Sequence, residues 1–223
     1  LAAQEPRALV PSVEQRSRLE HVESPPGSPG PWTGLFFRTL VRAEMRPRPL
    51  GFTAELLDAR ALVAPGTPLT NTHVNPADVL QLHGRLHAEN LALEGDALEV
   101  SAGRMTVDLG SRRLLARNDY RNTINSFTGL HATWSAPRGL LVRMFALTPV
   151  ERMPGDPVAL QQAWPVADRE RAGTVLAGAH TTWLALPGGL RVESYVLLLH
   201  EEDTPTAQTL DRRLLTPGLR VSR

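Results

Sequence analysis

Four arginines stand close together in the middle of the chain, where their side chains could bind anions. They fall within ten residues, at Arg112, Arg113, Arg117 and Arg121. A guanidinium group presents a planar fork of N–H donors that matches a carboxylate with two hydrogen bonds. Two interpretations stay open: the arginines bind a ligand that carries carboxylates, or they pair with Asp108 and Asp119 and only order a loop.

The basic residues of the whole chain are also unusual. All 24 are arginine, because the sequence contains no lysine. A GC-rich coding bias explains this composition, and so does a need for carboxylate-binding forks; composition does not separate the two. The formal net charge of +1 gives no overall positive field, so the sequence does not indicate nucleic acid as a partner.

Other residues that could do chemistry lack the necessary arrangement. His83 and His87 share a face of a predicted strand, where their Cβ atoms lie about 13 Å apart, too far for one metal ion. Residues 201–203 are Glu, Glu and Asp, and we interpret them as charged side chains that are exposed to solvent. Cysteine is absent, and so are nucleophile-elbow, phosphate-loop and dinucleotide motifs. We therefore predict no catalytic residue, no metal and no cofactor.

Strands must position these side chains, because apolar and polar residues alternate with a period of two along most of the chain. Tight turns and long connections also alternate from one end of the chain to the other. This layout predicts an antiparallel up-and-down transmembrane β-barrel, with short periplasmic turns and long extracellular loops. Nine strands and the beginning of a tenth are predicted near residues 13–22, 35–46, 52–62, 79–92, 98–109, 126–135, 140–148, 174–186, 190–200 and 218–223.

Further arginines fall on the polar faces of these strands, at Arg38, Arg42, Arg85 and Arg104. We expect these faces to line the lumen, because charge that faces lipid costs about 2–4 kcal/mol at mid-depth. The alternation changes phase at Gly103, which predicts a β-bulge there and places Arg104 on the polar face. The phase also changes between Glu55 and Asp58.

Separate predictions apply to the two ends of the chain. Residues 1–4 resemble the tail of a secretory signal peptide, and we expect residues 1–12 to form a periplasmic lead-in. The chain ends at Arg223 within a strand-like segment, whereas bacterial single-chain barrels have an even number of strands. We expect residues 1–223 to be a single domain, the N-terminal half of an outer-membrane β-barrel.

The central segment resembles the alginate export family of Gram-negative outer-membrane proteins. It reads GRMTVDLGSRRLLARN from Gly103 to Asn118 and continues as DYRNTINSFTG to Gly129. The segments 52–60 and 211–220 are similar to a strand and to a loop-to-strand entry of the same family. The resemblance implies a barrel of about 18 strands that passes anionic polysaccharide or small carboxylates through an arginine-lined lumen. This chain departs from the family's pattern because no lysine shares the pore lining.

Eight arginines are thus the candidate substrate-binding residues, and the resemblance implies a porin or exporter in the cell outer membrane. It also implies outer-membrane lipid and periplasmic export components as partners. Two other classes stay open: a periplasmic lyase or glycosidase, and a soluble carbohydrate-binding β-sandwich. Either of these would occur in the soluble periplasmic fraction, whereas a porin is extracted from the membrane.

Overall fold

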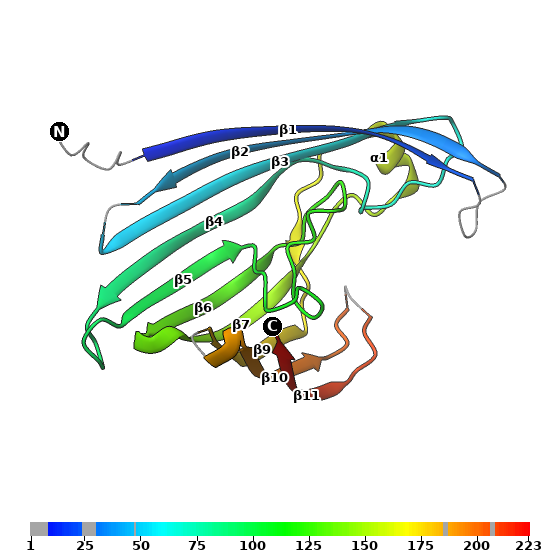
Figure 1. Ribbon diagram of the computed structural model, residues 1–223. Helices are drawn as coiled ribbons and strands as arrows, with labels where there is room; N and C mark the ends of the chain where they lie inside the picture. The colour runs from blue at the N-terminus through cyan, green and yellow to red at the C-terminus, as the bar shows by residue number, and fades with distance from the viewer. Residues whose placement is uncertain (1–8, 24–29, 47, 185–186, 206–207) are drawn as a thin grey trace.

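The structure is a computed structural model that describes residues 9–23, 30–46, 48–184, 187–205 and 208–223. Ten strands form one curved antiparallel sheet in the order β1-β2-β3-β4-β5-β6-β7-β9-β10-β11, and the two-residue strand β8 pairs with β7. Each strand of this path pairs with the next one along the chain (Figure 1). The predicted all-β, antiparallel up-and-down topology is confirmed.

The bounds of the strands differ from the predicted ones mainly at their ends. The strands are β1 (Leu9–Val22), β2 (Trp32–Met45), β3 (Leu50–Val63), β4 (Asn75–Glu89), β5 (Ala97–Met105), β6 (Phe127–Ala136), β7 (Leu140–Glu151), β8 (Arg169–Glu170), β9 (Thr174–Trp183), β10 (Arg191–Glu201) and β11 (Arg213–Ser222). Strand β1 begins at Leu9, inside the predicted lead-in, and β11 begins at Arg213 rather than near residue 218. Residues 1–8 of that lead-in, the predicted signal-peptide tail included, lie outside the described residues.

Short turns and long connections alternate along the sheet, as predicted. The turns include 90–96 and the 3-10 turns η1 (Pro137–Gly139) and η2 (Pro187–Gly189). Long connections link β3 to β4, β5 to β6, β7 to β9, and β10 to β11. The β7–β9 connection contains the short helix α1 (Pro157–Gln162). Residues 24–29, 47, 185–186 and 206–207, which belong to predicted connections or strand ends, lie outside the described residues.

The two faces of the sheet differ in polarity because side chains alternate along each strand. On β2, Phe36, Arg38 and Leu40 are buried on the concave side, whereas Leu35 and Val41 are exposed on the outward side. The same alternation places large apolar side chains outward on the other strands, among them Phe52, Leu56, Leu82, Leu86, Leu130, Met144, Val196 and Leu198. The sheet therefore has an apolar outer face and a charged inner face.

Of the two irregularities predicted in the strands, the one between Glu55 and Asp58 is present in the pairing and the one at Gly103 is not. The pairing of β3 with β4 shifts between Glu55 and Leu56, so that Leu80 turns inward although the alternation predicts it outward. Leu80 packs there against Leu57. No shift occurs where β5 pairs with its two neighbours, so the bulge predicted at Gly103 is wrong. Gly103 is needed instead for close strand contact, because a Cβ at its φ of +125° would lie 2.4 Å from the Leu82 carbonyl oxygen.

One short turn is fixed by a buried carboxylate. The side chain of Asp96 accepts hydrogen bonds from the backbone N–H groups of Leu91, Ala92 and Leu93, at 2.8–3.0 Å. It also accepts one from the indole N–H of Trp134, which lies on the outward side of β6. A tryptophan beside a short turn is typical of the aromatic girdle of a membrane barrel.

Within the described ranges, no helix is long and apolar enough to cross a membrane.

Candidate functional site

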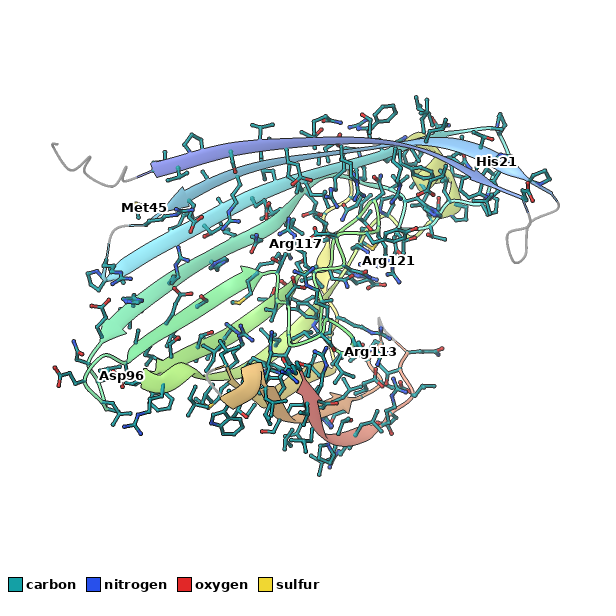
Figure 2. The ribbon with its side chains drawn as sticks, viewed as in Figure 1. His21, Met45, Asp96, Arg113, Arg117 and Arg121 are labelled. Carbon is teal, nitrogen blue, oxygen red and sulfur yellow. The ribbon has the colours of Figure 1, made fainter. Side chains whose placement is uncertain are left out.

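The connection between β5 and β6, residues 106–126, folds onto the concave face of the sheet and is called the inward loop here (Figure 1). Figure 2 shows Arg113, Arg117 and Arg121 on this loop, on the concave side. The predicted arginine cluster is therefore presented toward the interior of the curved wall. The wall residues Arg38, Arg42 and Arg85 face the same side, as predicted.

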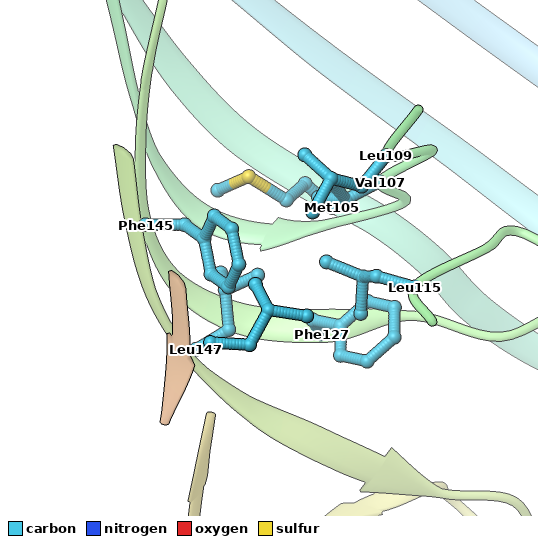
Figure 3. Packing of buried hydrophobic residues seen from close by; sticks show 8 residues of the cluster. Met105, Val107, Leu109, Leu115, Phe127, Phe145 and Leu147 are labelled. Atoms are coloured by element: carbon cyan, nitrogen blue, oxygen red, sulfur yellow. The ribbon is translucent and has the colours of Figure 1, made fainter. Parts of the chain in front are cut away.

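Apolar side chains attach one half of the inward loop to the wall. Val107, Leu109 and Leu115 of the loop are buried against residues of β5, β6, β7 and β10 (Figure 3). The wall side of this cluster comprises Met105, Phe127, Phe145, Leu147 and Leu197. At the other end of the loop, Ile124 packs against Leu40, Leu57 and Leu80. Burial of this apolar surface holds the loop on the wall, since each large side chain contributes about 1.5–3 kcal/mol.

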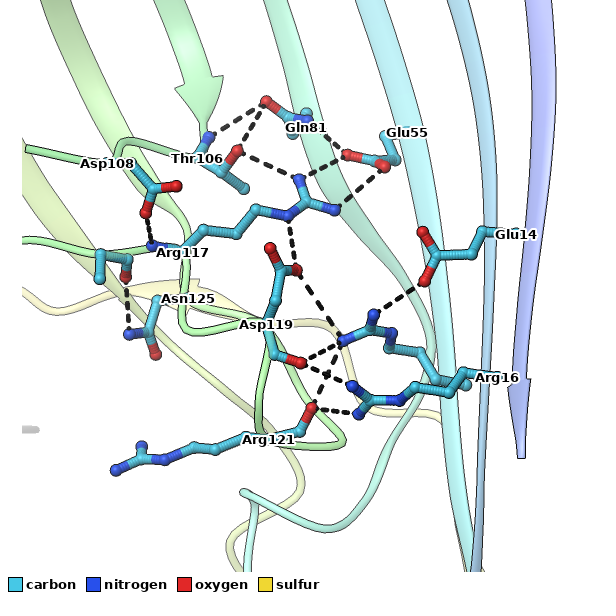
Figure 4. Close-up of polar contacts among 12 residues, drawn as sticks. Glu14, Arg16, Glu55, Gln81, Thr106, Asp108, Arg117, Asp119, Arg121 and Asn125 are labelled. Atoms are coloured by element: carbon cyan, nitrogen blue, oxygen red, sulfur yellow. Dashed lines mark hydrogen bonds and ion pairs between the residues drawn. The ribbon is translucent and has the colours of Figure 1, made fainter. Parts of the chain in front are cut away.

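Arg117 fixes the polar half of the loop. Its guanidinium donates to both carboxylate oxygens of Glu55 on β3, at 3.2 and 3.3 Å, and to Asp119 at 2.9 Å (Figure 4). Its backbone N–H donates to Asp108 at 2.9 Å. Burial alone would lower the pKa of Arg117, but the hydrogen bonds and charges of Glu55 and Asp119 raise that pKa above its ordinary value. Arg117 is thus a permanently charged structural link rather than a free anion-binding group.

Arginines of the wall bind the backbone of the loop tip. Arg16 on β1 donates to the carbonyl oxygens of Asp119, at 2.6 Å, and of Arg121 (Figure 4). Arg38 on β2 donates to the same two carbonyls, at 3.1 and 3.4 Å, and to the carboxylate of Glu14 at 2.9 Å. Only 4% of the Arg38 side chain is exposed, so this predicted lumen residue supports the loop and has no free donor surface for a ligand.

Arg42 and Arg85 belong to a second group, nearer the short-turn end of the wall. Together with Arg46 they surround the carboxylate of Glu44, at 2.8–3.2 Å. Glu99 adds a second carboxylate 3.8 Å from Arg85. Three guanidinium groups therefore face two carboxylates, which leaves this group with a surplus of positive charge. Arg42 and Arg85 also line a polar pocket of about 270 Å³ beneath the inward loop.

The four loop arginines divide into two pairs. Arg112 lies 3.1 Å from Asp108, and Arg117 is held as described above, which matches the loop-ordering interpretation. The guanidinium groups of Arg113 and Arg121 have no carboxylate or carbonyl partner among the described residues. Arg113 lines a pocket of about 540 Å³ between the loop and strands β9, β10 and β11. Arg113 and Arg121 remain available for an anion.

Arg104 does not lie on the concave face, and the prediction for it is wrong. It stands opposite Leu82 and Thr128, on the outward side of β5. Its guanidinium donates to the Glu170 carboxylate of β8 at 3.0 Å and to the Val79 carbonyl at 3.2 Å. Because Gly103 introduces no bulge, the alternation continues through it and carries Arg104 outward. Arg104 links the β7–β9 connection to the wall.

Several residues of the site were not predicted from sequence. Arg16 and Arg18 lie on the inward side of β1, and their alternation within that strand could have indicated it. Glu55 is the buried partner of Arg117, 62 residues away in sequence, and only the fold brings the two together. Asn122 donates to the carbonyls of Phe37, Arg60 and His73, a role without any sequence signal.

The described part of the chain contains no cluster of three or more His, Asp or Glu that could hold a metal ion.

These features define a class of protein. The wall is antiparallel and meandering, its outer face is apolar, its loops are long at one end only, and one long connection folds onto the charged inner face. This is the architecture of an outer-membrane β-barrel.

The chain belongs to the alginate export family, since the family model described as alginate export matches residues 36–223. The chain matches no curated protein and no solved structure.

Proposed function

We propose that this protein passes an alginate-like anionic polysaccharide, or small carboxylates, across the outer membrane along the arginine-bearing concave face. Family membership supports the transport of a polyuronate. The observation that carries the proposal is the inward loop: it narrows the concave side and presents Arg113 and Arg121 without carboxylate partners among the described residues. Rings of charged side chains at a constriction are the usual basis of pore selectivity.

The division of the loop arginines predicts which of them determine selectivity. The free guanidinium groups of Arg113 and Arg121 would meet the carboxylates of the substrate, whereas Arg112 and Arg117 would hold the loop in place. The surplus charge around Arg42 and Arg85 would add a second attractive region toward the short-turn end. Transport in this proposal needs no catalytic residue and no cofactor.

The test uses the full-length protein in a planar lipid bilayer. We expect open channels to prefer anions and added oligouronate to reduce the current. The double variant Arg113→Gln/Arg121→Gln should weaken both effects, and the uronate effect should fade as salt screens the exposed charges. A matched control is Arg138→Gln, because Arg138 is an exposed arginine in the short turn η1 and has no ion-pair partner in the described part of the chain. Unchanged reversal potential and unchanged uronate block in a correctly inserted double variant would refute the proposal.

We also propose that the apolar outer face contacts outer-membrane lipid and that periplasmic export components deliver the substrate. Membrane fractionation tests the first point. The protein should require detergent for extraction, whereas a lyase, a glycosidase or a carbohydrate-binding β-sandwich would appear in the soluble periplasmic fraction. Recovery in that soluble fraction would favour those alternatives.

A further inference from the structure

Tyr120 stands out because it is an aromatic residue that is both exposed and held in place. It occupies the tip of the inward loop, and 83% of its surface is exposed. Its hydroxyl group has no hydrogen-bond partner among the described residues. Most of the side chain is therefore open to solvent at the tip of the loop.

Three consecutive carbonyls fix the backbone around Tyr120. Arg18 on β1 donates to the Tyr120 carbonyl at 2.6 Å, while Arg16 and Arg38 bind the carbonyls on either side of it. The Arg18 guanidinium also lies 5.5 Å from the centre of the Tyr120 ring and 5.7 Å from that of Phe36. Cation–π contacts of this kind are worth about 0.5–1 kcal/mol at exposed sites. One side of the Tyr120 ring is thus supported by the wall, and the other is open.

A pocket adjoins the open ring at the long-loop end of the wall. Its volume is about 530 Å³, and its lining includes Arg18, Glu20, His73, Tyr120 and Arg121. Pockets of about 300–1,000 Å³ accommodate small organic ligands, which covers one or two sugar rings. The lining combines an aromatic face with hydrogen-bonding groups and with Arg121, whose guanidinium has no carboxylate partner in the described part of the chain.

We infer that Tyr120 is a stacking surface for a sugar ring at the extracellular mouth, and that Arg121 binds the carboxylate of the same or the next uronate residue. The C–H groups on one face of a pyranose carry partial positive charge and pack on the negative face of an aromatic ring. Because the backbone of the tip is held and the Arg18 contact favours one position of the ring, less conformational entropy is lost on binding than for a tyrosine on a free loop. This inference rests on the proposed function and assigns to the loop tip a contact that does not depend on charge.

The two contacts differ in their response to salt. Binding through Arg121 alone should vanish at high ionic strength, since the Debye length falls to about 3 Å at 1 M salt. Stacking on Tyr120 should persist, because burial of C–H surface is not screened. The contribution of Tyr120 is therefore best measured at high salt, where the arginines contribute least.

The experiment measures block of single-channel current by an oligomannuronate added from the long-loop side at 1 M salt. We expect Tyr120→Leu, which keeps an apolar side chain without a ring, to weaken the block by about three- to tenfold. Tyr120→Phe should keep most of the block because it keeps the ring. Trp164→Leu is the matched control, since Trp164 is an exposed aromatic of the β7–β9 connection that does not line this pocket.

The outcomes separate the inference from the proposed function. The stacking role would be overturned if Tyr120→Leu were blocked as strongly as the wild-type protein. The transport function would still stand if Arg113→Gln/Arg121→Gln weakened the block at low salt. Absence of any uronate block in the wild-type channel would overturn both. Folding of each variant is checked by its migration in gels before and after heating. Should Tyr120→Leu not fold, Tyr120→Ala, which also removes the ring, is compared with Tyr120→Phe in the same measurement.

Discussion

Glu55 is a carboxylate with only 4% of its side chain exposed, and two of its hydrogen bonds come from Arg117. Removal of one partner from a buried ion pair leaves the other charge uncompensated, which costs far more than the pair itself contributes. The same reasoning separates the arginines of the loop. Arg117 pairs with the buried Glu55, whereas Arg113 and Arg121 face open pockets, so equal substitutions should have unequal effects on stability.

Replacement of Arg117 by Gln should lower the free energy of unfolding by about 3 kcal/mol, because Glu55 loses its cationic partner. Urea unfolding of the protein in detergent micelles measures this change, and protease cleavage within residues 106–126 reports the local loosening. The control is Arg113→Gln, which removes an exposed charge and should change stability by less than about 0.5 kcal/mol. Similar unfolding midpoints for the two variants would contradict the structural role of Arg117.

Among the elements, the β7–β9 connection contains a carboxyl group that titrates near neutral pH. Partial burial raises the pKa of Asp168 to about 6, a hydrogen bond from the Met153 N–H opposes this rise, and the Asp78 carboxylate adds to it. Asn75 donates to Asp168 at 2.9 Å, and Arg104 faces both acids. The protonated form of Asp168 is therefore favoured by the folded connection more than by the unfolded chain.

The sign of the resulting pH dependence follows from this raised pKa. The folded connection binds a proton that the unfolded chain has already released, so its stability decreases as pH rises from about 4 through about 6. Hydrogen exchange of residues 152–170 should show higher protection factors at pH 5 than at pH 7.5. Asp168→Asn cannot titrate and should abolish the difference. Equal protection at both pH values in the wild-type protein would refute the prediction.

Strand pairing at β5 depends on a glycine that no other residue can replace without strain. A methyl group at Gly103 would lie 2.4 Å from the Leu82 carbonyl oxygen, at a φ of +125°. We expect Gly103→Ala to lower the free energy of unfolding by at least about 1–3 kcal/mol, measured by urea unfolding in micelles. Gly84→Ala is the control, because a Cβ there has no neighbour within 4 Å. Equal stability of the two variants would show that the strands adjust without cost.

The sequence predicts the strands and the faces of Arg38, Arg42 and Arg85 because alternation encodes directly which side of a sheet a residue occupies. It fails at Leu80 and Arg104, where the face depends on whether the neighbouring strand shifts its pairing. The sequence also does not distinguish the arginines that hold the loop from those that are free to bind an anion. Their roles depend on wall residues such as Glu55, and only the three-dimensional register brings these together with the loop.

For the whole molecule, the exposed outer face and the two outermost strands determine behaviour in water. Large apolar side chains cover the outward side, and within the described residues β1 and β11 each pair with a strand on one side only. Unpaired strand edges and apolar surface both promote association. We expect residues 1–223 expressed alone to aggregate without detergent, as measured by light scattering. A monodisperse monomer with cooperative unfolding in detergent-free buffer would revive the soluble carbohydrate-binding alternative.

The bonds that hold the loop tip have a consequence for how its specificity can change. Arg16, Arg18 and Arg38 bind main-chain carbonyls of residues 119–121, and every amino acid supplies such a carbonyl. Exchange of the side chains at 120 and 121 therefore leaves these bonds intact. Relatives, or engineered variants, could acquire a different cargo by two substitutions at the tip without rebuilding the barrel around it.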